Sequence, residues 1–317
     1  MRALHLGDQG PELLEDYPQP TPGDGEALIR LRLAGVCSTD LELVKGYYGY
    51  RGVLGHEFVG VVDAAADEAW VGQRVVGTIN LGCRRCPVCL GSGVEHCPHR
   101  TVLGIVAHDG AFADYLTLPI ANLLAVPESV SDEQAVFTEP LAAALRIREQ
   151  LRVPADERVA VVGPGRLGLL IAQVLALGGA QVTVLGRRIK SLVLPKRWGF
   201  DTGLASDAGA DSFDFVVETT GNEAGLAESL RLVRPLGTLV LKSTFQGEAQ
   251  VDLTKLVVGE ITVVGSRCGP FAPALRLLER RAIDVDSMVV AEYPLDDALA
   301  AMEHAARPGV LKILLRP

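Results

Sequence analysis

The sequence predicts an α/β protein that combines a β-rich part with a doubly wound parallel sheet. Three observations lead to this fold class. From residue 141 to residue 265, apolar runs of strand length alternate with helical patterns, which is typical of a parallel sheet covered by helices. The residues before this region read as short strands and turns. The length of 317 residues suits two domains.

A glycine-rich turn lies at the centre of the predicted parallel sheet. The apolar run Val159–Val162 leads into Gly163, Gly165 and Gly168, and a helical pattern and a second apolar run, Val182–Leu185, follow. The pattern G-x-G-x-x-G between a strand and a helix indicates dinucleotide binding, because the glycines allow a tight turn and close approach of a pyrophosphate to the helix N-terminus. The predicted cofactor-binding residues are Gly163, Gly165, Arg166, Leu167, Gly168, Gly186, Arg187 and Arg188.

The end of the second strand indicates which dinucleotide binds. NAD-dependent enzymes usually place Asp or Glu there to hold the ribose 2′-hydroxyl. This chain has Gly186, Arg187 and Arg188 instead, so no carboxylate repels a 2′-phosphate and two guanidinium groups can bind one. We therefore expect NADP rather than NAD. The alternative is that both arginines are solvated residues at the start of a helix.

The remaining elements follow from periodicity. In the β-rich part, Ala27–Ala34 alternates apolar and polar residues as a half-buried strand does, and Ala3–Leu6 is a shorter strand. The elements expected after the glycine turn are a helical piece at Ile189–Trp198, strand Phe213–Glu218, helix Glu223–Val233, strands Thr238–Lys242 and Ile261–Val264, helices Pro273–Arg281 and Leu295–Ala305, and strand Leu311–Leu315.

Composition excludes several classes of protein. A net charge of −9 argues against nucleic acid or an anionic membrane as partner. The first residues lack the apolar core of a signal peptide, and the most apolar helical stretch, Leu167–Leu177, is too short to span a bilayer. We expect a cytoplasmic protein. Because disulfides are rare there, the six cysteines indicate metal binding or a reactive thiol.

Two groups of residues have the chemistry of metal ligands. Cys37 lies about twenty residues before His56 and Glu57, and a thiolate, an imidazole and a carboxylate together suit zinc. The second group is a C-x2-C-x2-C-x7-C pattern formed by Cys83, Cys86, Cys89 and Cys97. Four thiolates in so short a loop predict a closed structural zinc site. A disulfide pair or an iron–sulfur cluster are the alternatives for this second group.

Together with the glycine turn, these motifs resemble those of the zinc-containing alcohol, polyol and sugar dehydrogenases of the medium-chain dehydrogenase/reductase superfamily. The resemblance covers almost the whole chain. It implies a GroES-like catalytic domain at residues 1–140 and 266–317, with a structural-zinc lobe at 83–97. It also implies a Rossmann dinucleotide-binding domain at residues 141–265. Two zinc ions per chain are then expected, one catalytic and one structural.

The resemblance also implies the catalytic residues. The catalytic zinc would be held by Cys37, His56 and one or both of Glu57 and Glu139, and Glu139 stands in an E-P-L pattern typical of the polyol and sugar dehydrogenases. Glu139 could instead be a carboxylate that only caps a helix dipole. Thr39 matches the hydroxyl that relays the substrate proton in relatives, or else is a plain turn residue.

Glu42 stands where the best-known alcohol dehydrogenases often carry a histidine that ends the proton relay. It could shuttle protons or bond a sugar hydroxyl. Tyr47, Tyr48 and Tyr50 lie between the two ligand motifs and either stack on a substrate ring or pack the loop.

The function expected from the resemblance is hydride transfer between NADP(H) and an alcohol, polyol or sugar, with zinc acting as a Lewis acid. The alternatives are a metal-free quinone or enoyl reductase of the same fold and a non-enzymatic NADP-binding protein. The expected partner is a small-molecule substrate, with no nucleic acid and no membrane, and the chain is expected to form a homodimer or homotetramer.

Overall fold

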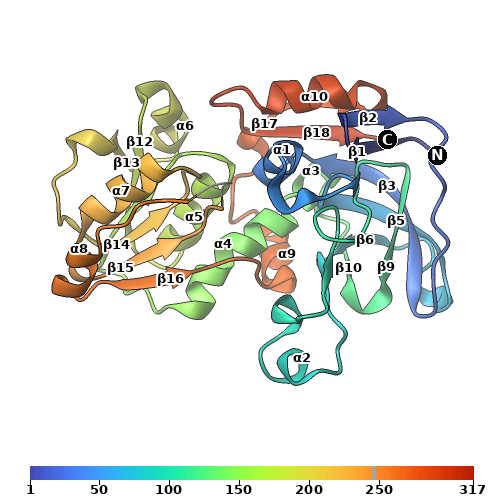
Figure 1. Ribbon diagram of the computed structural model, residues 1–317, viewed down its shortest axis with the longest axis horizontal. Helices are drawn as coiled ribbons and strands as arrows, with labels where there is room; N and C mark the ends of the chain where they lie inside the picture. The colour runs from blue at the N-terminus through green and yellow to red at the C-terminus, as the bar shows by residue number, and fades with distance from the viewer. Residues whose placement is uncertain (245–247) are drawn as a thin grey trace. The chain divides into compact units, whose positions relative to one another are not determined.

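The computed structural model describes residues 1–244 and 248–317 and divides the chain into two compact units (Figure 1). Unit 1 comprises Met1–Glu139 and Phe271–Pro317, and unit 2 comprises Pro140–Pro270. The chain returns to unit 1 at Phe271 rather than at residue 266, because Ser266 is still bonded into unit 2. Its amide donates to Leu241 O at 3.0 Å, and its hydroxyl accepts a bond from Lys242 Nζ at 3.2 Å.

Unit 1 is built from β-sheets with short helices between their strands. A three-stranded antiparallel sheet has the order β2-β1-β4, and a seven-stranded sheet has the order β10-β6-β5-β3-β18-β17 with β9 also paired to β3. A short pair, β7-β8, lies beside the four-cysteine segment. The strands are β1 (Ala3–Gly7), β2 (Gly10–Leu14), β3 (Glu26–Gly35), β4 (Gly52–Val53), β5 (Glu57–Ala65), β6 (Arg74–Gly77), β7 (Asn80–Leu81), β8 (Thr101–Val102), β9 (Tyr115–Pro119), β10 (Leu123–Ala125), β17 (Val289–Pro294) and β18 (Lys312–Arg316).

The helices of unit 1 are short. The α-helices are α1 (Ser38–Val44), α2 (Pro87–Gly91), α3 (Asp132–Ala135), α9 (Phe271–Glu279) and α10 (Ala298–Ala305). The 3-10 turns are η1 (Tyr47–Gly49), η2 (Glu68–Trp70), η3 (Val94–His96), η4 (Ile120–Asn122), η7 (Asp286–Met288) and η8 (Leu295–Asp297). The single helix expected at Leu295–Ala305 is therefore a 3-10 turn followed by α10. The alternation read in β3 is confirmed, since Ile29, Leu31 and Leu33 are buried while Arg30 and Arg32 are exposed.

Unit 2 is a parallel sheet in the order β13-β12-β11-β14-β15-β16. Its strands are β11 (Arg158–Val162), β12 (Gln181–Gly186), β13 (Asp201–Leu204), β14 (Phe213–Glu218), β15 (Val233–Leu241) and β16 (Thr262–Gly265). Its helices are α4 (Thr138–Gln150), which begins at the end of unit 1, α5 (Arg166–Ala176), α6 (Val193–Arg197), α7 (Glu223–Leu232) and α8 (Leu253–Val258), with 3-10 turns η5 (Ile189–Leu192) and η6 (Ala205–Asp207).

The chain order in this sheet creates a switch point beside β11. After β11 the chain passes through α5 to β12 on one side, and β14 later pairs with β11 on the other side. Ligands of doubly wound sheets bind at such a point, at the carboxyl ends of the strands. The glycine turn follows β11, so the fold places it at this position. The link between β13 and β14 holds only the short turn η6 and no α-helix.

No helix among residues 1–244 and 248–317 has the length and apolar character needed to cross a membrane.

Candidate active site and metal centres

The first group of predicted ligands is held by the N-terminus of α1 and the start of β5. Cys37 precedes α1, and its amide donates to Asp40 Oδ2 at 2.8 Å, which fixes the first turn of the helix. Gly35, at the end of β3, pairs with Glu57. A Cβ atom at Gly35 would lie 2.6 Å from Glu57 Oε2 and 2.7 Å from Val136, so only glycine permits this close approach. The two motifs are thereby brought together.

Cys37, His56 and Glu57 form one compact group. One potential ligand atom from each residue lies within 4.8 Å of the others. His56 is 3% exposed and Glu57 1% exposed, while Cys37 is half-buried. Burial opposes the charged form of His56, but the negative charges of Asp40 and Cys37 raise its pKa well above the usual value. The group therefore favours a positive charge at this point, which a metal ion supplies.

Two further buried residues, which the sequence analysis missed, place charges next to His56 and Glu57. Asp40 is fully buried and its Oδ1 lies 3.2 Å from His56 Nδ1. Lys312 on β18 is 1% exposed, and its ammonium forms an ion pair with Glu57 Oε2 and lies 5.4 Å from the centre of the Phe137 ring. Asp40 is positioned to orient the imidazole, and Lys312 to orient the carboxylate.

The charges of this site fit a divalent cation. With Cys37 as a thiolate and His56 neutral, the forms in which these side chains bind a metal ion, the site holds three anionic groups, Cys37, Asp40 and Glu57, against the single ammonium of Lys312. Two negative charges are left in a buried setting, where unpaired charge is costly. Glu57 Oε1 is also buried and has no hydrogen-bond partner among the described residues. A thiolate, an imidazole and a carboxylate oxygen are ligands that zinc takes.

The other residues predicted for the catalytic group lie outside this set of three. Thr39 Oγ1 is 3.8 Å from Cys37 Sγ and is therefore next to the site. Glu139 lies in the first turn of α4, is half-buried and does not belong to the compact ligand group. Glu42 is half-buried on α1 and forms an ion pair with Lys45 at 2.7 Å.

The tyrosines of the intervening loop divide between two roles. Tyr50 is 5% exposed and donates to Val53 O at 2.7 Å and to His108 O at 3.0 Å, so it packs the loop. Tyr48 is 64% exposed and its ring centre lies 4.3 Å from that of Tyr47. Tyr48 also has a positive φ of 58° in the turn η1. Only Tyr47 and Tyr48 therefore remain available for a ligand.

Cys83, Cys86, Cys89 and Cys97 form the second metal centre. All four are free thiols, and their sulfur atoms lie within 4.8 Å of one another. Sγ–Sγ distances of 3.7 Å (Cys83–Cys97), 3.9 Å (Cys86–Cys97) and 4.0 Å (Cys83–Cys89) match the edge of about 3.8 Å of a tetrahedron with metal–sulfur bonds of about 2.3 Å. A disulfide, with sulfurs about 2.05 Å apart, does not fit these distances.

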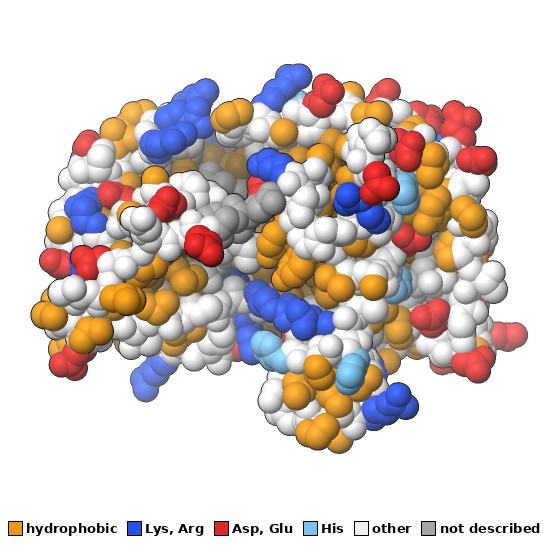
Figure 2. Space-filling model, viewed as in Figure 1, with side chains coloured by type: hydrophobic (Ala, Val, Ile, Leu, Met, Phe, Trp, Pro, Cys, Tyr) orange, Lys and Arg blue, Asp and Glu red, His pale blue; other side chains and the backbone are white. Residues whose placement is uncertain are grey.

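The thiols of the four-cysteine centre differ in how readily they ionise. Amide bonds from Arg85 and Cys86 lower the pKa of the Cys83 thiol to about 6, whereas burial and the neighbouring thiols raise the pKa of Cys89 to about 12. The nearby Arg84 donates to Asn122 Oδ1 at 2.7 Å. On the face in Figure 2, the lobe that carries α2 shows hydrophobic side chains, and Leu90 of α2 is 76% exposed.

The predicted cofactor turn has the geometry that its glycines suggested. Gly163 has φ 108°, which favours glycine, and Gly165 precedes the first turn of α5. A Cβ at Gly168 would lie 2.0 Å from Gly163 O, whereas one at Gly165 would meet no atom within 4 Å. Gly168 thus serves helix packing, and the open space at Gly165 leaves its backbone accessible to a ligand.

The other predicted cofactor-binding residues lie at the start of α5 and at and just after the end of β12. Arg166 and Leu167 form the first turn of α5 and are half-buried. Gly186 ends β12, and the exposed Arg187 and Arg188 follow it. Arg188 directly precedes the 3-10 turn η5, so its backbone lies at a helix start, as the alternative in the sequence analysis expected. Its exposed guanidinium is nevertheless available to an anion.

Cys268 is the one cysteine of the sequence that belongs to neither metal centre. It is half-buried, with φ 52°, and its sulfur accepts a hydrogen bond from Arg267 Nη1 at 3.2 Å.

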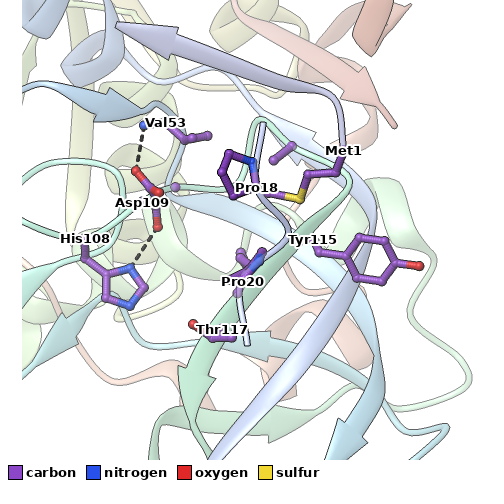
Figure 3. A pocket seen from close by; sticks show the side chains of 11 residues that line it. Met1, Pro18, Pro20, Val53, His108, Asp109, Tyr115 and Thr117 are labelled. Atoms are coloured by element: carbon purple, nitrogen blue, oxygen red, sulfur yellow. Dashed lines mark hydrogen bonds between the residues drawn. The ribbon is translucent and has the colours of Figure 1, made fainter. Parts of the chain in front are cut away.

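Figure 3 shows a pocket of unit 1 that has no cysteine among the residues that line it. It measures about 180 Å³ and is lined by apolar residues and by His108 and Asp109. Both oxygens of Asp109 are already bonded, Oδ1 by the amide of Val53 at 2.9 Å and Oδ2 by the hydroxyl of Tyr17 at 2.7 Å. No predicted site residue lines this pocket, so it does not compete with the Cys37 group as a candidate active site.

Comparison with known proteins gives two matching family models. The model described as the alcohol dehydrogenase GroES-like domain matches residues 23–128, and the model described as zinc-binding dehydrogenase matches residues 167–280. The chain is 32% identical to L-galactonate-5-dehydrogenase of Escherichia coli K12 over 87% of this chain and 86% of that protein. It is 31% identical to sorbitol dehydrogenase of Halalkalibacterium halodurans over 96% of this chain and 95% of that protein.

Among solved structures, a protein of Sinorhizobium meliloti 1021 described as a zinc-binding dehydrogenase, bound to NADP, has a TM-score of 0.89. It is 29% identical to this chain, and the match covers 100% of this chain and 99% of that one. These findings confirm the predicted fold class, a GroES-like part with a Rossmann-like parallel sheet.

Proposed function

Because the chain belongs to the zinc-containing medium-chain dehydrogenase/reductase superfamily, we propose that it transfers hydride between NADP(H) and a CH–OH group of an alcohol, polyol or sugar. The observation that carries the proposal is the buried group of Cys37, His56 and Glu57, whose surroundings hold two uncompensated negative charges. The glycine turn of unit 2 supplies the second requirement, a site for a dinucleotide.

In this proposal Cys37, His56 and Glu57 hold the catalytic zinc. Glu139 completes the set from the first turn of α4, directly or through water. When bound, zinc would act as a Lewis acid toward the substrate oxygen, and the dinucleotide would supply the hydride acceptor. Asp40 keeps the His56 ring in one orientation, and Lys312 limits the charge that Glu57 presents to the metal. The four cysteines of the lobe hold the second, structural zinc.

The proton of the substrate hydroxyl leaves by way of α1. The hydroxyl of Thr39, beside Cys37 Sγ, accepts this proton and gives up its own in the same relay. Glu42 lies three residues further along the helix and therefore on the same face, where its carboxylate receives the proton and passes it to solvent. The ion pair with Lys45 holds Glu42 in this position.

We propose NADP as the preferred cofactor. Arg187 and Arg188 are exposed at the end of β12 and can form charge-assisted bonds with a 2′-phosphate. No carboxylate stands at residues 186–188 to repel that phosphate. A 29% identical protein has been solved with NADP bound, and a 25% identical protein of Escherichia coli with NADH, so the proposal depends on Arg187 and Arg188.

Polyols or sugar derivatives are the proposed substrates. The names of the two relatives refer to L-galactonate and to sorbitol, both polyhydroxylated compounds. Glu42 and Glu139 can accept hydrogen bonds from hydroxyl groups, and the exposed Tyr48 ring can pack against the C–H face of such a compound.

We further propose that the chain acts in the cytoplasm as a homodimer or homotetramer. β16 is the edge strand of its sheet, and Val263 on it is 42% exposed. The neighbouring α8 exposes Val257 and Val258 by 74% and 79%. An apolar edge of this kind invites a partner copy. The free thiols of all six cysteines suit a reducing compartment.

The test is a metal, cofactor and substrate assay on the purified full-length chain. We expect about two zinc ions per chain, tighter binding of NADP than of NAD, and NADP reduction with members of a polyol and aldose panel. Cys37→Ala should keep NADP binding and lose turnover. Turnover by zinc-free protein, or by Cys37→Ala, would favour the metal-free reductase reading. Cofactor binding with zinc at both sites, but without turnover of any compound in the panel, would favour a non-enzymatic NADP-binding protein.

A further inference from the structure

Thr219 occupies the position next to the glycine turn at the switch point of unit 2. β11 and β14 are parallel neighbours in which Val162 pairs with Glu218, so Gly163 and Thr219 follow their strands side by side. The amide of Thr219 donates to Val162 O at 2.9 Å. The side chain of Thr219 is therefore set beside the backbone of the turn.

The hydroxyl of Thr219 forms hydrogen bonds to the backbone of the glycine turn at Gly163, a residue with more backbone freedom than most. Thr219 Oγ1 lies 2.8 Å from Val162 O and 2.8 Å from Gly163 O, so its proton is shared between the two carbonyl oxygens. Gly163 O also accepts a bond from the amide of Gly165 at 2.9 Å. Glycine has more backbone freedom to lose than other residues. The hydroxyl thus restricts the residue that would otherwise move most.

The same hydroxyl sets how closely α5 approaches the sheet. A Cβ at Gly168 would lie 2.7 Å from Thr219 Oγ1, which shows that the hydroxyl fills the space against the first turn of α5. The N-terminus of this helix offers the amide groups for a phosphate. Thr219 therefore touches both parts of the expected phosphate site, the turn and the helix.

The segment that carries Thr219 is itself fixed by Glu218. This carboxylate is 4% exposed, and its Oε1 accepts bonds from the amide of Thr220 at 2.5 Å, from the hydroxyl of Thr220 at 2.6 Å and from the amide of Gly221 at 3.3 Å. The amide of Gly221 also donates to Ser243 Oγ at 3.0 Å, after β15. The ends of three strands are joined by this network.

We propose that Thr219 is a positioning residue for the dinucleotide, whose hydroxyl holds residues 163–168 in the shape that binds the pyrophosphate. The inference rests on the proposed function, because it requires that the chain binds NADP or NAD. A turn that already has its ligand-bound shape loses less conformational entropy when the ligand binds. Because the pyrophosphate is common to both dinucleotides, the loss of the hydroxyl weakens both by the same factor.

The test compares variants of the full chain by titration calorimetry with NADP and with NAD, at a temperature well below every melting point. Thr219→Val keeps the shape of the side chain and removes the hydroxyl, and Thr219→Ser keeps the hydroxyl. Thr183→Val is the matched control, because it removes a half-buried hydroxyl from the neighbouring strand β12, away from the turn. Thr219→Ala supplies a second hydroxyl-free variant should the valine variant not fold.

We expect Thr219→Val to weaken NADP and NAD alike by about tenfold, the value of one hydrogen bond of about 1.4 kcal/mol. Thr219→Ser and Thr183→Val should stay within about twofold of the wild type. In turnover assays, KM for the cofactor should rise while kcat stays within about twofold.

Three results would overturn this inference and leave the proposed function standing. Thr219→Val could bind the dinucleotides with wild-type affinity, or Thr219→Ser could lose as much affinity as Thr219→Val. Thr183→Val could also lose as much affinity as Thr219→Val, which would mean that affinity only follows stability. A wild-type chain that binds neither dinucleotide would refute the proposed function first, and the inference with it.

Discussion

The ion pair of Lys312 and Glu57 gives the sharpest prediction about the metal site. Both side chains are 1% exposed, so Lys312→Met leaves a carboxylate buried without its partner. Removal of one member of a buried pair costs about 3–5 kcal/mol. We therefore expect the free energy of unfolding of unit 1, measured without metal, to fall by about this amount. The matched change Lys45→Met removes an ammonium that is 64% exposed and should cost less than about 1 kcal/mol.

The same variant should bind zinc more tightly. The ammonium repels a divalent cation at the neighbouring site, by about 3 kcal/mol even at about 10 Å with an effective dielectric constant of about 20. Its removal frees Glu57 to give its full charge to the metal. We expect the zinc affinity to rise at least about tenfold, so added zinc should restore more stability to Lys312→Met than to the wild type.

The assay can isolate unit 1 because the two tryptophans divide between the units, Trp70 in unit 1 and Trp198 in unit 2. In a Trp198→Phe background, fluorescence during urea unfolding reports on unit 1 alone. The measurement is made after chelation and again with saturating zinc. The reasoning is refuted if Lys312→Met costs no more than Lys45→Met, or if its loss of stability is the same with and without zinc.

Three further predictions concern the cofactor, the lobe and pH. Replacing Arg187 and Arg188 together by Ser should weaken NADP binding at least about tenfold and leave NAD binding within about twofold, and equal losses in the two titrations would contradict the 2′-phosphate assignment. Cys89→Ser should remove one zinc per chain and lower the melting temperature while the other zinc stays bound, whereas an unchanged zinc content would argue against the lobe as a zinc site. Burial raises the pKa of Asp214, but bonds from Arg234 and Arg158 outweigh it and hold that pKa well below the usual value. The pKa of Asp214 is lower in the folded protein than in the unfolded chain. The bonds of Asp214 to the two arginines therefore contribute stability above about pH 4, and this stability is lost as the pH falls toward the folded pKa. Asp214→Asn should therefore lower the stability of unit 2 at pH 7 and flatten its loss in acid, and an unchanged acid profile would contradict this account.

Much of the fold could be predicted because its signals are local. The strand Phe213–Glu218 was predicted with the observed ends, since it is rich in β-branched and aromatic residues and lies between two other strands, where Val216 and Val217 are buried. The hairpin strand Gly10–Leu14 was missed, because three of its five residues, Gly10, Pro11 and Glu12, disfavour strands and only pairing with β1 holds it extended.

The residues around the metal site show where sequence reasoning ends. Cys37 and His56 were found because zinc ligands are chemically distinctive. Lys312 was read as part of an apolar strand, although a lysine inside such a strand is a signal of a buried ion pair. Its partner Glu57 lies far away in the sequence, so only the pairing of β18 with β3 and of β3 with β5 reveals the contact. Thr219 was missed for the same reason, since its bonds cross from β14 to β11.

The measurement that tests the central claim most directly is zinc content, determined on zinc-saturated, dialysed wild type and Cys37→Ala, together with NADP-dependent oxidation of a polyol such as sorbitol. The account predicts about two zinc ions per wild-type chain and about one in Cys37→Ala, with oxidation lost along with the missing ion. One zinc in both proteins, or two in both, would contradict the assignment of Cys37, His56 and Glu57 as the catalytic metal site.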